Sequence, residues 1–106
     1  MDYAIALVAE INRGRPDFAV GICGSGQIMA ITSNRFRFMR STLIQAVSEA
    51  ALAREHGDAN MLAIGADSVD AVTVEQLLST FLTTTALGDH YAARRERLAR
   101  LDISKL

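Results

Sequence analysis

The sequence contains little cysteine and little net charge, and each of these absences excludes some kinds of site and partner. One cysteine among 106 residues excludes an internal disulfide and a zinc site made of several cysteines. A single free thiol is typical of reducing compartments, so we expect a cytoplasmic location. The formal net charge is −1, which provides no surface-wide basic field of the kind that nucleic-acid binding needs.

Long apolar runs are absent as well. No stretch approaches about 18 residues, the length that a membrane-spanning helix needs, and no signal peptide is recognisable, so we expect no membrane contact. Apolar residues are nevertheless plentiful in short segments: 50% of the residues are hydrophobic and 22% are charged. That balance predicts one globular domain over residues 1–106, with a modest core.

The short apolar segments alternate between helical and strand-like patterns. Apolar spacing and capping residues predict five helices, and compact apolar runs predict three strands between them. Strands that alternate with helices form a parallel sheet, so we expect an α/β fold with a C-terminal helix. The predicted helices are Asp2–Asn12, Gln27–Ser33, Val47–His56, Thr73–Leu82 and Asp89–Leu101, and the predicted strands are Phe18–Ile22, Arg40–Ala46 and Ala59–Gly65.

Particular residues mark the ends of these segments. Ser48 and Thr73 are the expected N-caps of their helices, whereas Gly14 and Gly57 are expected to end the helices before them. The first and third strands have uncharged apolar centres, which predicts that both of their faces are buried.

One stretch, Asp17–Gln27, combines a strand, a glycine turn and the start of a helix. This arrangement directs backbone N–H groups at one small volume, which suits a phosphate or a developing oxyanion. Cys23 lies at the edge of that volume, and the start of a helix favours the thiolate form of a cysteine. Ligands of parallel α/β folds bind at the carboxyl ends of strands, so this turn is the main candidate site.

Each candidate also has a plainer interpretation. A lone cysteine is commonly a small buried hydrophobe, and a glycine turn ends many strands that bind nothing. His56 could simply cap the helix that it ends. The C-terminal arginines could form a solvated or interface surface. The basic and aromatic segment from Arg35 to Phe38 could bind single-stranded nucleic acid, but we favour a plain connection with two core aromatic side chains.

Several segments, taken together in their order, resemble one enzyme family, the type B ribose-5-phosphate isomerases, which include galactose-6-phosphate isomerase. The matching segments run through nearly the whole chain: Asp2-Tyr3-Ala4, Gly21-Ile22-Cys23-Gly24-Ser25-Gly26, Ala30-Ile31 with Asn34, Arg40, Leu52-Ala53-Arg54-Glu55-His56, Asp58-Ala59-Asn60, Ile64-Gly65 and Phe81-Leu82-Thr83-Thr84. The resemblance implies a Rossmann-like three-layer α/β/α sandwich that forms a homodimer or a higher homo-oligomer.

The same resemblance implies aldose–ketose isomerisation of a phosphorylated sugar, of the ribose 5-phosphate and ribulose 5-phosphate type. The reaction passes through an enediolate and uses neither a metal nor an organic cofactor. Cys23 would be the base, and the Ser25 hydroxyl with the backbone of Gly24, Gly26 and Gln27 would stabilise the enediolate oxygen.

Two further substrate contacts follow from the resemblance: His56 would lie near the substrate, and Arg94 would hold the phosphate, partly across the dimer interface. A family member would also begin with a strand, a helix and another strand before the position of Met1, about 30–50 residues by the size of such a unit. These would carry an aspartate–histidine pair. We therefore expect the 106 residues to be incomplete at the N-terminus, with about three strands.

Four positions depart from the family's pattern. Ile28 replaces a glycine and would close the turn or demand another backbone angle. Gly57 replaces an asparagine, Asp67 reverses the charge of an arginine, and His90 replaces another arginine. These departures support an alternative: a catalytically degenerate or truncated homologue that acts as a dimerising or phosphate-binding module.

Overall fold

The computed structural model describes residues 1–106 and confirms the predicted order of helices and strands. None of its helices has the length and apolarity that crossing a membrane requires. The helices are α1 (Asp2–Asn12), α2 (Gln27–Ser33), α3 (Val47–Glu55), α4 (Ala71–Thr83), α5 (Asp89–Ala99) and the short 3-10 helix η1 (Ile103–Lys105), and the strands are β1 (Ala19–Cys23), β2 (Ser41–Leu43) and β3 (Met61–Gly65).

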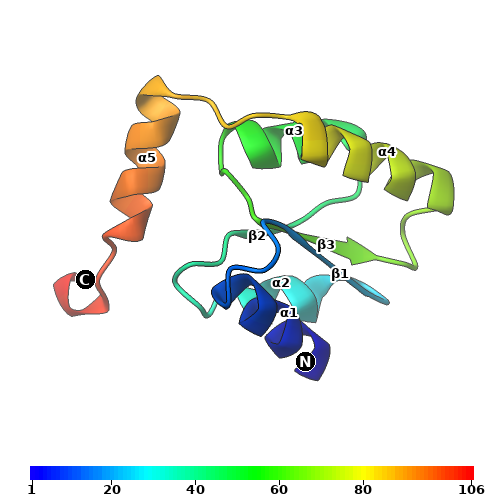
Figure 1. Ribbon diagram of the computed structural model, residues 1–106, viewed down its shortest axis with the longest axis horizontal. Coiled ribbons are helices and arrows are strands. Elements are labelled where there is room, and N and C mark those ends of the chain that lie inside the picture. Colours follow the sequence, from blue (N-terminus) through cyan, green and yellow to red (C-terminus); the bar gives the residue numbers. More distant parts are fainter.

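The three strands form one parallel sheet in the order β1-β3-β2. Figure 1 shows α1 and α2 below this sheet and α3 and α4 above it. The central strand β3 is buried along its whole length, as its uncharged sequence predicts. The predicted three-layer α/β/α sandwich with a three-stranded parallel sheet is confirmed.

Two apolar cores fill the spaces between the layers. Successive side chains of β3 alternate between them: Leu62 and Ile64 face α3 and α4, whereas Met61 and Ala63 face α1 and α2. The first core also contains Ile44, Ala50, Ala53, Ala59, Leu77 and Phe81, and the second Ala4, Val8, Ala19, Met29 and Met39.

The two outer strands differ from the sequence prediction. β2 keeps only three residues of the predicted Arg40–Ala46, because it pairs with β3 alone and that pairing ends at Leu43. β1 is also an edge strand, and Ile22 near its carboxyl end is 52% exposed. The prediction that both faces of β1 are buried is therefore wrong at that end.

The start of α3 is capped by a different residue from the predicted Ser48, which lies inside the helix. The Glu49 carboxylate accepts hydrogen bonds from the backbone amides of Gln45 and Ala46, at 2.7 and 3.3 Å. A glutamate in the first turn thus satisfies the amides just before the helix.

The start of α4 lies two residues earlier than predicted, at Ala71 instead of Thr73. The Asp70 carboxylate accepts a hydrogen bond from the Thr73 amide at 2.8 Å, so Asp70 is the N-cap and Thr73 lies in the first turn. Hydrogen bonds from Thr73 lower the pKa of Asp70, because they favour the ionised carboxylate.

Two helix ends were expected to use glycine, and only one does so in the predicted way. Gly14 follows α1 with a φ of +72°, as a glycine after a helix end commonly does. After α3 the left-handed conformation belongs to Asp58, with a φ of +45°, and not to Gly57. The prediction for Gly57 was wrong: the turn places its left-handed residue one position later, at Asp58, whose carboxylate accepts hydrogen bonds from Arg54 and Arg40.

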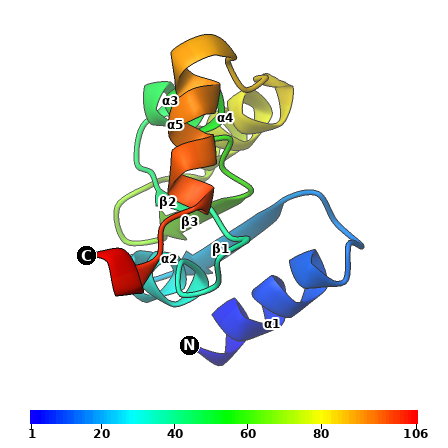
Figure 2. The same cartoon turned by 90° about the vertical axis from the view of Figure 1, so that its left-hand side faces the viewer.

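Helix α5 stands beside the rest of the molecule and buries none of its residues (Figures 1 and 2). Polar contacts hold it there. Arg95 donates hydrogen bonds to the carbonyl oxygens of His56 at 3.0 Å and Leu87 at 2.6 Å. Arg37 donates to two carbonyl oxygens at the end of α5, at 3.2 and 3.3 Å. Arginines therefore satisfy the carbonyl groups that helix ends leave free.

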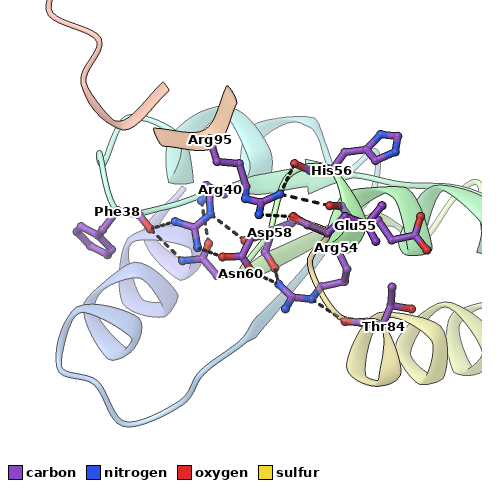
Figure 3. A network of polar contacts seen from close by, with 11 residues as sticks. Phe38, Arg40, Arg54, Glu55, His56, Asp58, Asn60, Thr84 and Arg95 are labelled. Carbon is purple, nitrogen blue, oxygen red and sulfur yellow. Dashed lines mark hydrogen bonds and ion pairs between the residues drawn. The ribbon is translucent and has the colours of Figure 1, made fainter. Parts of the chain in front are cut away.

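A polar network holds the amino ends of the strands (Figure 3). Arg54 is 8% exposed, and its guanidinium donates to Asp58 Oδ1 at 2.8 Å and to the Ala59 carbonyl oxygen at 2.6 Å. It also lies 4.8 Å from the centre of the Phe18 ring. Arg40 donates to the Asp58 carbonyl oxygen at 2.8 Å. The turn between α3 and β3 is thus fixed by two cations.

Arg54→Leu is expected to lower the free energy of unfolding by about 2–4 kcal/mol, because it leaves the buried carbonyl oxygen of Ala59 without a donor and removes one of the two arginines at the Asp58 carboxylate. Arg13→Leu is the matched control, since Arg13 pairs with Glu10 at an exposed site, where a pair contributes less than about 1 kcal/mol. Urea unfolding measures both losses. Equal losses in the two variants would contradict the assigned role of Arg54.

Candidate active site

Two loops lie against each other where β1 and β3 end. The strand register pairs Cys23 with Gly65. Beyond this pair, the Ala66 amide donates to the Cys23 carbonyl oxygen at 2.8 Å, and the Asp67 amide donates to the Gly24 carbonyl oxygen at 3.0 Å. Hydrogen bonding therefore continues past the sheet and fixes the predicted turn against its neighbour.

Two glycines make this close approach possible. Gly26 has a φ of +77°, and a Cβ atom there would lie 2.5 Å from Leu43 Cδ1 and 3.0 Å from the Gly65 amide nitrogen. A Cβ atom on Gly65 would lie 2.7 Å from the backbone of Ser25. The contacts with Leu43 and Ser25 are shorter than those that real Cβ atoms make, so larger residues would push these neighbours aside.

The side chains of Cys23 and Ser25 each accept a hydrogen bond from the backbone of this turn. The Gly26 amide donates to Cys23 Sγ at 3.1 Å, and the Gln27 amide donates to Ser25 Oγ at 3.3 Å. Cys23 is half-buried against the second core, and Ser25 is exposed. Because Ser25 Oγ accepts from the backbone, its own O–H remains free to donate to another molecule.

Ile28 and Asp67 border the turn. Ile28 lies in the first turn of α2, and positive φ among non-glycine residues occurs only at Asp58 and Asp89, so Ile28 needs no unusual backbone angle. Asp67 Oδ2 would lie 3.0 Å from a Cβ atom on Gly24. A carboxylate therefore borders the turn, where it opposes the approach of an anion.

His56 and Arg94 lie away from this turn. α3 begins after the carboxyl end of β2 and ends at His56, just before the amino end of β3. The length of a five-residue strand, roughly 15 Å, therefore separates the His56 end of the sheet from the Cys23 end. The structure collects Cys23, Gly24, Ser25, Gly26 and Gln27 in one loop, and it places His56 and Arg94 at the opposite edge.

The His56 edge carries a stack of rings. The His56 imidazole lies parallel to the Tyr91 ring, with 4.2 Å between centroids and 10° between planes. The His90 ring lies 4.0 Å from the Tyr91 ring, and the Arg94 guanidinium lies 5.8 Å from it. We call these four residues the ring patch. Tyr91 was not among the predicted site residues, although it lies next to His90 and one turn before Arg94 in the sequence.

A cleft of about 770 Å³ lies between α5 and the body of the molecule. Arg37, Arg40 and Arg95 line it, but each donates hydrogen bonds to carbonyl oxygens of the chain. No three histidine, cysteine, aspartate or glutamate side chains are grouped to hold a metal ion.

Comparison with known proteins identifies the family. The model of the ribose/galactose isomerase family matches residues 1–98. The chain belongs to this family. The putative sugar phosphate isomerase YwlF of Bacillus subtilis is 30% identical over 93 residues, and a putative sugar phosphate isomerase of Rickettsia bellii is 36% identical over 93 residues.

A solved structure of the same family confirms the expected Rossmann-like fold. The ribose 5-phosphate isomerase of Thermotoga maritima is 32% identical, with a TM-score of 0.90 over 94% of this chain and 69% of that protein. The two relatives match 88% of this chain, which spans 62% of the Bacillus protein and 65% of the Rickettsia protein. The match therefore covers somewhat under two thirds of these isomerases.

Substituting Gly26 tests whether the isomerase-family turn depends on close loop contact. We expect Gly26→Ala to cost about 2–4 kcal/mol of stability, because it adds both backbone strain and a clash with Leu43 and Gly65. Gly14→Ala is the matched control: its φ is also positive, but nothing lies within 4 Å of the new Cβ. Gly14→Ala should lower the stability by about 1 kcal/mol, from backbone strain alone. Equal losses by urea unfolding would contradict the close contact.

Proposed function

We propose that this chain isomerises a phosphorylated aldose, of the ribose 5-phosphate type, to the corresponding ketose, with Cys23 as the base. The observation that carries the proposal is the hydrogen bond of 3.1 Å from the Gly26 amide to Cys23 Sγ. An N–H group directed at the sulfur supports a negative charge there. Family membership supports the reaction type, and the thiol requires a reducing compartment such as the cytoplasm.

The proposed reaction moves one carbon-bound proton. The Cys23 thiolate takes the proton from C2 of the open-chain aldose, and the electron pair moves through C1 onto the carbonyl oxygen. The Ser25 hydroxyl donates to the enediolate oxygen that forms. A proton then passes from the C2 oxygen to the C1 oxygen, and the thiol returns its proton to C1. The ketose is released with Cys23 again a thiolate.

The proposal requires two copies of the chain. Cys23 and the ring patch lie at opposite edges of one sheet, so one copy cannot apply both to a single sugar phosphate. In a symmetric dimer each copy can supply its turn to one site and its ring patch to the other. The Arg94 side chain is exposed on a helix that buries no residue, which leaves it available to a phosphate bound by the partner.

A second candidate function is binding of a phosphate ligand without catalysis, by a homologue that has lost the reaction. Asp67 favours it, because its carboxylate borders the turn where an anionic intermediate would form. This function needs the ring patch but not the thiol.

Exchange of the C2 proton of ribose 5-phosphate with deuterated water separates the two functions. We expect Cys23→Ala to lower the exchange rate about 10²–10⁴-fold, the usual contribution of a positioned base. Ser48→Ala, at an exposed serine on α3, should leave the rate unchanged. Thermal stabilisation of the wild type by ribose 5-phosphate without exchange would contradict catalysis and support the binding module.

A further inference from the structure

The ring patch contains one residue that touches all the others. Tyr91 stacks on His56, contacts the ring of His90, and lies under the guanidinium of Arg94. His56, His90 and Arg94 are exposed, whereas Tyr91 is half-buried among them. The three cationic or titratable side chains are therefore arranged around one uncharged ring.

The backbone around this ring is held rigidly. Arg95 donates to the carbonyl oxygen of His56 at 3.0 Å and to that of Leu87, just before α5, at 2.6 Å. These bonds fix the start of α5 against the end of α3, and so fix Tyr91 opposite His56. Figure 3 shows the His56 imidazole pointing away from the arginine network, on the outer side of the α3 end.

The contacts with Tyr91 restrict the conformations of side chains that are otherwise exposed. An exposed arginine or histidine samples several rotamers, and a ligand that binds it must select one of them. A parallel ring at 4.2 Å restricts the His56 imidazole to one plane, and a cation over the ring restricts Arg94. Tyr91 thus holds both side chains in restricted orientations before an anion binds.

We propose that Tyr91 is a positioning residue, which holds His56, His90 and Arg94 as one preformed recognition surface for the phosphate-bearing part of the substrate. This inference rests on the proposed function. Its ring, and not its hydroxyl, makes the contacts, so phenylalanine should replace it and leucine should not. The effect belongs to binding, because the ring patch is far from the thiol of the same copy.

Steady-state kinetics and histidine resonances test the proposal together. Tyr91→Leu should raise the KM for ribose 5-phosphate about fivefold or more with kcat within about twofold, while Tyr91→Phe keeps both values. Phe38→Leu is the matched control, because it also removes a half-exposed ring from an aromatic pair. The His56 ring protons should lose their upfield ring-current shift in Tyr91→Leu and keep it in Tyr91→Phe.

Three results would overturn the inference. The first is an unchanged KM in Tyr91→Leu although the His56 resonances have moved. The second is equal impairment of the leucine and phenylalanine variants. The third applies if the wild type shows no turnover, in which case titration with inorganic phosphate replaces kinetics. The His56 and His90 resonances should then shift on phosphate addition in the wild type and in Tyr91→Phe. An equal shift in Tyr91→Leu would contradict the proposal. Tyr91→Met substitutes for the leucine variant if that variant does not fold.

Discussion

The contact between the loops that follow β1 and β3 is the constraint on which the site depends. Gly26 and Gly65 allow backbone to lie against backbone, and two amides of the second loop donate to carbonyl groups of the first. The loop held in this way turns the Gly26 amide toward the sulfur of Cys23. The position of the thiol therefore results from contacts made by residues with almost no side chain.

The topology that gathers these loops also separates the site into two parts. In a parallel sheet every strand ends at the same edge, so each connecting helix must return to the other edge. His56 ends such a helix, and α5 docks against that end through Arg95. In the proposed reaction, the ring patch and the thiol turn are complementary parts that a second copy would combine. The isolation of α5 from both apolar cores fits this division, because the helix buries no residue and is held by arginine–carbonyl hydrogen bonds and by the stacking of Tyr91 on His56.

Much of this structure could be predicted from the sequence, and the failures have physical causes. The order of elements and the buried β3 followed from apolar patterns, because a central strand has the same surroundings on both faces. The caps of α3 and α4 did not, since Glu49 accepts from the Gln45 amide and Asp70 from the Thr73 amide, and both helices begin before the residues that were expected to be the caps. The separation of His56 from Cys23 follows from topology and not from any local signal. The role of Tyr91 depends on a helix whose docking involves arginine–carbonyl contacts, which leave no apolar pattern.

Complementation between two inactive variants tests the division of the site most directly. Cys23→Ala lacks the proposed base, and Arg94→Ala lacks a proposed phosphate contact, but a mixed dimer contains one site with both residues intact. After the two variants are unfolded together and refolded, the mixture should recover roughly a quarter of the wild-type activity, as random pairing in a twofold dimer gives. Activity that stays at the average of the two separate variants would contradict a site shared between copies.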